Sequence, residues 1–288
     1  MKTDSKIETE NKKNTENKMK IGNRIFDVEN DCYIMGILNV TPDSFSDGGK
    51  WNDREKAKEH TAQMIREGAS IIDIGGESTR PGHEQISVEE EINRVVPMIR
   101  MVKENFDIPV SIDSYKSQVV EAALKAGADM VNDIWGLKYD RRVADLIAEY
   151  KVPCCLMHNR QKPEYNNYLD DVCQDLRDTL TIAKNAGILD EQIILDPGVG
   201  FGKTYEQNLI IINNLERLTE LGYPVLLATS RKSVIGLTLN LPTDQRVEGT
   251  LVTTVMGVEK KAAFVRVHDV KENMRAIRMT QAIMKAGK

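Results

Sequence analysis

Residues 37–49 hold the densest set of side chains capable of chemistry in this chain. The segment ends an apolar run, residues 33–38, that is short enough to form a buried strand. Three hydroxyls, two carboxylates and an amide then follow within nine positions: Asn39, Thr41, Asp43, Ser44, Ser46 and Asp47. A plain connection needs about four residues, and α/β proteins place chemistry on polar loops at strand ends. A surface loop with helix-capping residues is the alternative interpretation.

The same arrangement recurs along the chain. Eight apolar runs each lead into polar residues: 33–38, 70–74, 109–112, 130–131, 152–156, 193–195, 225–227 and 262–267. Stretches with helical spacing separate them, for example 57–66, 88–102, 117–125 and 169–184. Alternating strands and helices predict parallel βαβ units, and eight units in about 260 residues predict a (β/α)8 TIM barrel. A doubly wound open sheet is the alternative, although it would more often show about six strands and a glycine-rich turn after the first.

Composition predicts one folded domain with a polar tail. The 288 residues are 41% hydrophobic, which suffices for a core. Residues 1–20 are almost all polar or charged, so we expect a disordered tail, followed by one barrel domain over 21–288. That tail lacks the apolar stretch of a secretory signal and the arginines of a transit peptide. No run of 18 apolar residues predicts a membrane span.

Charge and cysteine content exclude further classes. A net charge of -5 and a pI near 5.6 argue against nucleic-acid binding. The four cysteines form no C-x-x-C pair, so we expect buried free thiols in a reducing cytoplasm. The four histidines have no zinc-binding spacing. Residues 198–204, G-V-G-F-G-K-T, end like a phosphate-binding Walker loop, but Pro197 stands where that motif needs glycine. A dinucleotide fingerprint from Gly198 fails because its last glycine position is Lys203.

The strand ends indicate what the barrel mouth would bind. Asp113, Asn132 and Asp196 end three of the runs, and together they suit a flat heterocycle with several N–H donors. Each could instead cap the helix that follows. Lys232, Arg266 and His268 lie at or after the ends of the last two runs, where this fold commonly holds phosphate.

Two further observations concern the reaction. Asn39 offers a hard oxygen for a Mg²⁺ ion that keeps most of its waters while bridging phosphate oxygens. No obvious nucleophile–base pair is present, which favours a displacement driven by positioning and electrostatics.

At this level of detail the chain resembles the dihydropteroate synthase family, over residues from Tyr33 to the end. Seven blocks carry the resemblance: 35–49 (M-G-I-L-N-V-T-P-D-S-F-S-D-G-G), 73–82 (D-I-G-G-E-S-T-R-P-G), 111–113 (S-I-D), 131–134 (V-N-D-I), 196–204 (D-P-G to G-K-T), 230–233 (S-R-K-S) and 266–270 (R-V-H-D-V). The blocks follow one another in order at the spacings expected of the family.

The resemblance implies a transferase of folate biosynthesis. It would join 6-hydroxymethyl-7,8-dihydropterin diphosphate to 4-aminobenzoate, releasing pyrophosphate and 7,8-dihydropteroate, with Mg²⁺ as cofactor. The implied pterin-binding residues are Asp113, Asn132, Ile134, Met157, Asp196, Lys232 and Arg266. The implied diphosphate-binding residues are Asn39, which would also meet the metal, Arg266 and His268. The implied aminobenzoate pocket is Phe45, Thr79, Arg80, Pro81, Phe201 and Ser233, and the implied catalytic residues are Asp47, Arg80 and Lys232.

The resemblance carries other expectations and one departure. It implies a cytoplasmic sulfonamide target that forms a homodimer through its last helices, 245–258 and 270–285. Ala228 stands where the family usually has glycine, and Asp47 would fit a helix-capping role equally well. Two alternatives are a non-catalytic pterin-binding paralogue and a pterin-binding methyltransferase that serves a corrinoid protein. The presence of Asn39, Lys232 and the whole 37–49 block argues against both.

Overall fold

The computed structural model describes residues 18–40, 49–78 and 85–287. The strands are β1 (Lys18–Ile21), β2 (Arg24–Asp27), β3 (Tyr33–Asn39), β4 (Ala69–Gly75), β5 (Val110–Asp113), β6 (Met130–Asp133), β7 (Cys154–Met157), β8 (Ile193–Asp196), β9 (Leu226–Leu227) and β10 (Phe264–Val267). The α-helices are α2 (Gly49–Glu67), α3 (Val88–Asn105), α4 (Ser117–Lys125), α5 (Arg142–Tyr150), α6 (Tyr168–Asn185), α7 (Tyr205–Asn213), α8 (Glu216–Thr219), α9 (Ser233–Leu239), α10 (Val247–Glu259) and α11 (Val270–Lys285). Two 3₁₀ turns, η2 (Asp190–Gln192) and η3 (Thr243–Gln245), complete the order.

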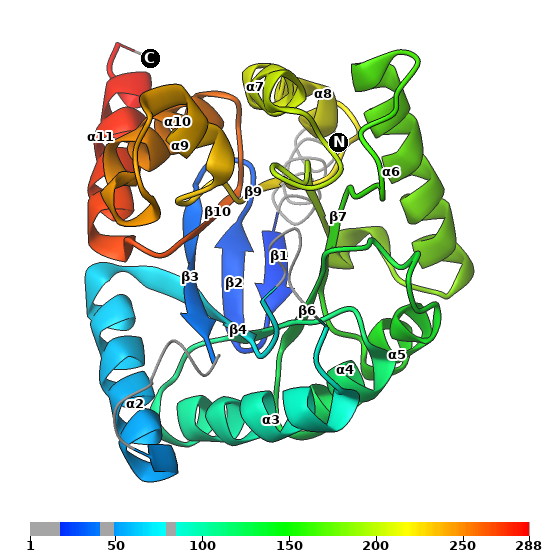
Figure 1. The fold of residues 1–288 in the computed structure, drawn as a ribbon, viewed down its shortest axis with the longest axis vertical. Coiled ribbons are helices and arrows are strands. Elements are labelled where there is room, and N and C mark those ends of the chain that lie inside the picture. Colours follow the sequence, from blue (N-terminus) through cyan, green and yellow to red (C-terminus); the bar gives the residue numbers. More distant parts are fainter. Residues whose placement is uncertain (1–17, 41–48, 79–84, 288) are drawn as a thin grey trace, which may run out of the picture.

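Strands β3 to β10 form one parallel sheet that curls into a barrel (Figure 1). From β3 to β8 each strand pairs with the next, β9 pairs with β10, and β10 pairs with β3. The remaining gap lies between β8 and β9, where a parallel bridge joins Leu195 to Val225. There the Leu195 N–H donates to the Pro224 carbonyl at 2.9 Å. The predicted TIM barrel is confirmed, and the doubly wound alternative is wrong because the sheet closes on itself.

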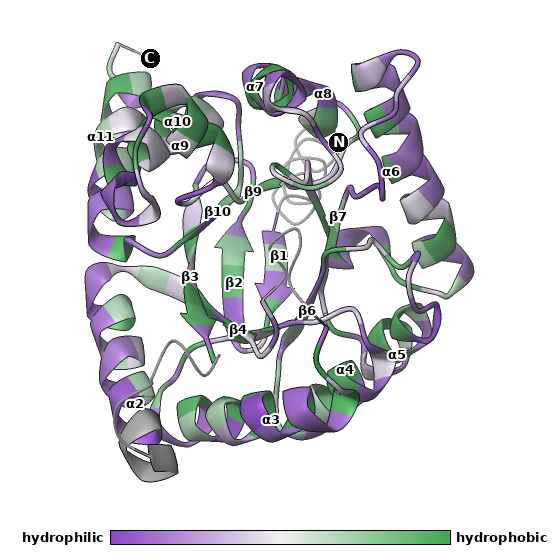
Figure 2. Cartoon of the chain, viewed as in Figure 1, coloured by the Kyte–Doolittle hydropathy of each residue, from purple (hydrophilic) through white to green (hydrophobic). Residues whose placement is uncertain are grey.

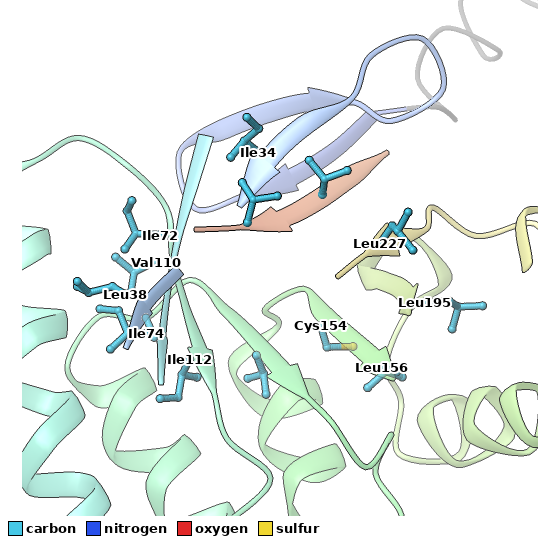
Figure 3. Packing of buried hydrophobic residues seen from close by; sticks show 14 of the residues in the cluster. Ile34, Leu38, Ile72, Ile74, Val110, Ile112, Cys154, Leu156, Leu195 and Leu227 are labelled. Carbon is cyan, nitrogen blue, oxygen red and sulfur yellow. The ribbon is translucent and has the colours of Figure 1, made fainter. Parts of the chain in front are cut away.

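The main hydrophobic core lies between the barrel wall and the helices around it. Alternate strand residues point outward into this layer, among them Ile34, Leu38, Ile72, Ile74 and Val110 (Figure 3). Helices such as α3 and α6 carry green and purple bands in Figure 2, as expected for helices with one face on the barrel and one in solvent. None of the described helices is both long and apolar enough to cross a bilayer.

A second core fills the inside of the barrel at its N-terminal end. The antiparallel hairpin β1–β2 supplies Met19, Ile21 and Phe26 to this core. Barrel residues supply the rest: Met35, Ile71, Met130, Cys155, Ile194, Leu226, Ala263 and Phe264. Figure 1 shows the hairpin lying within the ring of barrel strands. The Phe26 ring meets Tyr33 edge-on, with centroids 4.9 Å apart.

The predicted boundary of the disordered tail at residue 20 is wrong. Residues 18–20 belong to β1, where Met19 is 2% exposed while its neighbours Lys18 and Lys20 are exposed. The alternation of polar and apolar residues lets a lysine-rich strand bury one face. Residues 1–17 lie outside the described residues, so their disorder stays a prediction.

Candidate active site

The polar groups at the barrel mouth follow from the alternation of side chains along its strands. Residues two apart in a strand face the same side of the sheet. On four alternate strands, the inward position above the apolar floor is polar: Ile71 precedes Asp73, Met130 precedes Asn132, Ile194 precedes Asp196, and Phe264 precedes Arg266. Four side chains from alternate strands form a layer in barrels of this kind. Here that layer is hydrophilic: Asp73, Asn132 and Asp196 are buried, and Arg266 is partly buried.

Arg266 is the centre of this layer. Its Nε donates to Asp73 Oδ2 and its terminal amino group donates to Asp113 Oδ2, both at 2.6 Å. Burial by itself would lower the pKa of Arg266, but the two carboxylates hold it above its usual value, so the guanidinium stays charged. Burial raises the pKa of Asp113, against the opposing effect of Arg266 and with a further contribution from Asp73.

Several acceptors in the layer have no hydrogen-bond partner among the described residues. They are Asp73 Oδ1, Asp113 Oδ1 and the hydroxyl of Ser111, each inaccessible to solvent. Asp73 Oδ2 also accepts from the Asn132 amide at 3.2 Å. Buried polar atoms are nearly always hydrogen-bonded, and the exceptions cluster at functional sites. Unpaired carboxylate oxygens indicate a ligand that supplies N–H donors.

Asp196 and Lys232 lie on the other side of the mouth. Asp196 Oδ1 accepts from the Gly198 N–H at 2.6 Å. Burial raises the pKa of Asp196 to about 6, although the Gly198 bond and the charge of Lys232 oppose the shift. The Lys232 ammonium lies 4.1 Å from the centroid of the Phe201 ring, a cation–π contact.

An apolar wall completes the mouth. Tyr115, Ile134 and Met157 form a small buried cluster, and Trp135 and Phe201 pack against it. Flat apolar and aromatic surfaces beside a few convergent polar groups are typical of small-molecule sites. Ala228, the departure from the expected glycine, packs against the inner core of the barrel.

The residues predicted to meet phosphate lie at the rim. His268 follows β10, and its Nδ1 lies 3.0 Å from the Ser230 hydroxyl, which also accepts from the His268 backbone N–H at 3.1 Å. Asn39 ends β3 and is exposed, and Ser233 begins α9 and is exposed. Among the described residues, no three His, Cys, Asp or Glu side chains gather into a metal-binding group.

One of the alternative interpretations, helix capping, can be judged here. Asp113, Asn132 and Asp196 do not cap the helices that follow, because α4, α5 and α7 have Lys116, Arg141 and Thr204 at their N-caps. The capping alternative is therefore wrong for these three. The predicted loop residues Phe45, Asp47, Thr79, Arg80 and Pro81 lie outside the described residues.

Sequence reasoning missed two parts of this region. Asp73 begins the block 73–82 but has no predicted role, although the signal for one is a carboxylate inside the run I-I-D-I, two residues from inward-facing Ile71. The second part is a polar cluster of His158, Asp175 and Lys203 beside the mouth. In the sequence, Lys203 stands out only as part of the segment that ends like a phosphate-binding loop.

A cavity of about 620 Å³ lies beside the mouth rather than in it. It is lined by Arg160, Pro163, Glu164, Tyr165, Asn166, Asp171, Gln174, Asp175 and Gln207. It shares Asp175 with the polar cluster but contains none of the predicted substrate contacts. The convergence of buried charged groups makes the mouth, not this cavity, the candidate active site.

Comparisons with known proteins identify the family of the chain. The profile of a family described as "Pterin binding enzyme" matches residues 35–268. The dihydropteroate synthase of Clostridium beijerinckii is 62% identical over 268 residues, covering 93% of this chain and 100% of that one. The Bacillus subtilis dihydropteroate synthase is 52% identical and covers 88% of this chain and 89% of its own length.

Solved structures show the same fold. The crystal structure of Clostridium difficile dihydropteroate synthase in the presence of pteroic acid superposes with a TM-score of 0.88 at 50% identity, covering 90% of this chain and 98% of that one. The Xanthomonas albilineans enzyme with 4-aminobenzoic acid gives a TM-score of 0.89 at 39% identity, covering 94% and 99%.

The barrel, its buried polar mouth and the family match together define a pterin-binding enzyme. With relatives this similar over nearly the whole chain, the protein belongs to the dihydropteroate synthase family. It is a transferase of folate biosynthesis that condenses 6-hydroxymethyl-7,8-dihydropterin diphosphate with 4-aminobenzoate to give 7,8-dihydropteroate and pyrophosphate.

Proposed function

We propose that the pterin ring binds in the buried layer around Arg266. A dihydropterin presents amino and ring N–H groups along one edge, and these groups would donate to Asp73, Asp113 and Asp196. The unpaired Oδ1 atoms of Asp73 and Asp113 carry this proposal, because a buried acceptor without a partner costs about 1–3 kcal/mol. Asn132 would add an amide contact, while Ile134 and Met157 pack against the ring and the planar guanidinium of Arg266 stacks on it.

The chemical step would rely on charge rather than on a strong base. The bond between the exocyclic methylene carbon and the diphosphate oxygen breaks, and the aniline nitrogen then forms the new carbon–nitrogen bond and releases its proton to water. The neutral aromatic amine needs no base to make it nucleophilic. Lys232 and Arg266, fixed in place before the reaction, would stabilise the charge that develops as the bond breaks.

The diphosphate would lie at the rim, between Asn39, Arg266 and His268. Among the described residues of the rim, the exposed Asn39 offers a single amide oxygen, which suits a Mg²⁺ ion that arrives with the diphosphate. Mg²⁺ held mainly by water and phosphate oxygens is typical of phosphoryl substrates. When bound, it would neutralise charge on the leaving diphosphate.

The aminobenzoate would bind between the rim and the apolar wall. Phe201 and Ser233 are its described candidate contacts, and the cation–π contact fixes the Phe201 ring beside Lys232. The family resemblance adds four further residues to this pocket: Phe45, Thr79, Arg80 and Pro81. It also supplies two catalytic candidates, Asp47 and Arg80. The Yersinia pestis dihydropteroate synthase has been solved in complex with a sulfonamide drug. We expect a sulfonamide to compete with aminobenzoate here as well.

A coupled assay of pyrophosphate release tests these assignments. Release should require both substrates and fall when Mg²⁺ is chelated. Asp113→Asn should raise the KM for the pterin diphosphate at least tenfold, the scale of one charged hydrogen bond, with little effect on the KM for aminobenzoate. Asp145→Asn, on the exposed face of α5, is the matched control. Equal kinetics for the two variants would remove Asp113 from the pterin site.

We also propose a homodimer formed through α9, α10 and α11, which pack beside one another. Large apolar side chains on these helices are exposed: Leu237, Leu239, Val252, Met279 and Ile283. Exposed apolar patches of this kind mark interfaces, and twofold dimers are the commonest assembly. Val252→Asp combined with Met279→Asp should convert the dimer to a monomer in light scattering, whereas Ile25→Asp, equally exposed on the hairpin, should not. A wild-type monomer would refute the proposal.

A cytoplasmic location completes the proposal. All four cysteines are buried and free, as expected in a reducing compartment. Fractionation of cells expressing the protein would test this.

A further inference from the structure

The side chain of Lys203 connects separate parts of the chain beside the mouth. Its ammonium donates to the carbonyls of Gly198 and Phe201, both at 3.0 Å, and to Nδ1 of His158 at 2.8 Å. An ammonium group has three N–H donors, and Lys203 uses all of them within the protein. It is therefore not placed to bind phosphate, despite the resemblance of its motif to a phosphate-binding loop.

His158 is held in one tautomer by its neighbours. Burial lowers the pKa of Lys203 to about 7, although the charge of Asp196 opposes the shift. While Lys203 is protonated its ammonium has no lone pair, so Nδ1 of His158 accepts and the ring hydrogen is on Nε2. That Nε2 lies 3.0 Å from Asp175 Oδ2, which also accepts from Arg160 Nε at 2.6 Å. Burial lowers the pKa of His158 to about 4, so the ring is neutral at physiological pH. Asp175, His158 and Lys203 thus form one continuous hydrogen-bonded chain.

The loop between β8 and α7 has several anchors: the Gly200 N–H donates to Asn208 Oδ1 at 2.6 Å, and the Gly202 carbonyl accepts from the Tyr165 hydroxyl at 2.7 Å. Lys203 adds the bonds that join the Gly198 and Phe201 carbonyls to His158. Gly198 and Gly202 both adopt left-handed backbone conformations, with φ of 69° and 53°. A Cβ atom on Gly198 would lie 1.9 Å from the His158 carbonyl oxygen, and one on Gly202 would lie 2.3 Å from that of Arg160. The loop is pressed against the segment after β7, where no side chain longer than hydrogen fits at these two positions.

The same loop reaches both halves of the proposed substrate site. At its start, the Gly198 N–H holds the Asp196 carboxylate. At its far side, the Phe201 ring lies against the Lys232 ammonium. A shift of the loop would therefore move Phe201, which belongs to the loop and packs against the small buried cluster of the apolar wall, more than Asp196, which is anchored in a barrel strand.

We propose that Lys203, held by His158 and Asp175, is a positioning residue for the condensation reaction. It fixes the β8–α7 loop so that Phe201 stands beside Lys232 at the aminobenzoate end of the site. The proposal rests on the assignment of Phe201 to the aminobenzoate pocket made above. Its consequence is selective: loss of Lys203 weakens aminobenzoate use and turnover while leaving pterin diphosphate binding nearly intact.

Steady-state kinetics of full-length Lys203→Met provide the test, because methionine keeps an unbranched chain and removes all three donors. The KM for aminobenzoate should rise about tenfold or more and turnover should fall, while the KM for the pterin diphosphate stays within about threefold. Lys162→Met, 76% exposed in the neighbouring loop, is the matched control. Unchanged constants, or an equal rise in both KM values, would overturn the proposal.

A fluorescence measurement without substrate tests the position of the loop independently of the assignment of Phe201 to the aminobenzoate pocket. In a Trp51→Phe background, Trp135 is the single tryptophan, and it packs against the same buried cluster as Phe201. Lys203→Met should shift its emission while circular dichroism shows a folded protein. Asp175→Asn is a milder change and should give a smaller shift of the Trp135 emission. This variant is used for the test if Lys203→Met does not fold. Absence of a shift in a folded variant overturns the positioning role.

The companion variant Phe201→Ala tests the substrate assignment itself. If Phe201→Ala leaves the KM for aminobenzoate unchanged, and Lys203→Met still shifts the Trp135 emission, the assignment of Phe201 to the aminobenzoate pocket fails. The loop-holding role of Lys203 then survives without its link to aminobenzoate.

Discussion

At the N-terminal end of the barrel, Met19, Ile21 and Phe26 of the hairpin fill the interior, and each is at most 2% exposed. At the C-terminal end, the same barrel interior presents Asp73, Asp113 and Arg266, and two of their carboxylate oxygens have no hydrogen-bond partner among the described residues. The strands are shared by both ends. A step of two residues along a strand is enough to pass from one environment to the other.

This contrast separates the residues that stabilise the fold from those that act on substrate. Apolar contacts at the hairpin end gain free energy of folding from each buried side chain. Unpaired acceptors and like charges at the mouth lower the stability of the substrate-free protein, a common property of functional sites. We therefore expect substitutions at one end to change stability with little effect on chemistry, and substitutions at the other to do the reverse.

Lys232→Ala should give the largest effect, at the mouth. Losing one preorganised cation should reduce turnover roughly 10²- to 10³-fold, with a melting temperature equal to that of wild type within error. Steady-state kinetics and thermal unfolding measure the two quantities. Lys125→Ala, on the exposed side of α4, is the control. Turnover within threefold of wild type would remove Lys232 from the reaction.

Phe26→Ala should give the opposite result at the hairpin end. Removing a buried phenylalanine should lower the free energy of unfolding by about 3–5 kcal/mol, while turnover at 25 °C stays unchanged. Urea unfolding followed by circular dichroism measures the difference. Ile25→Ala is the matched control, since Ile25 is 67% exposed on the same strand and should change stability by less than about 0.5 kcal/mol. A large loss of turnover in Phe26→Ala would contradict the separation of the two ends.

Acidic pH should weaken pterin binding, because the ionised Asp196 carboxylate accepts an N–H donor much more strongly than its protonated form. With its pKa raised to about 6, Asp196 is ionised at pH 7 and about nine-tenths protonated at pH 5. The Kd of 6-hydroxymethylpterin should therefore rise about tenfold between those values. Calorimetry at both pH values measures it. Asp196→Asn should bind more weakly with a shallower pH dependence, the remainder belonging to Asp113. A constant Kd would show that Asp196 takes no part.

Removal of residues 1–17 should have the smallest effect. Their composition cannot bury enough apolar surface to offset the entropy of ordering, so melting temperature and turnover should stay at wild-type values. Removal of residues 1–27 is the informative comparison, because it also takes away Met19, Ile21 and Phe26 and should lower the melting temperature markedly. A loss of several degrees in the shorter deletion would mean that residues 1–17 contribute to stability.

Much of the barrel was predictable because its strands are apolar runs with abrupt polar ends. Every one of the eight runs corresponds to a strand, although β9 is reduced to Leu226–Leu227. The hairpin was missed because its lysines resemble the polar tail. Its signals were the alternation in K-M-K-I and the turn residues Gly22 and Asn23, which favour a hairpin.

The site was predictable in part. Asp113, Asn132, Asp196 and Arg266 do converge, since the C-terminal ends of parallel strands share one face. The two-residue step from Ile71 predicts that Asp73 faces the barrel interior. Only its contact with Arg266 distinguishes it from other buried polar residues. The role of Lys203 depends on φ values and on a histidine 45 positions earlier in the sequence. No local spacing encodes either.

The hairpin has a consequence for the order of events during synthesis. Phe26 leaves the ribosome early, but the centroid of its ring packs 5.6 Å from that of Phe264, which is translated about 240 residues later. At typical elongation rates of about 5–20 residues per second, that delay is on the order of 10–50 s. During this interval an apolar hairpin face waits without its last partner, exposed to chaperones or to other nascent chains. The hairpin that fills one end of the folded barrel is therefore an exposed apolar surface, prone to aggregation, during synthesis.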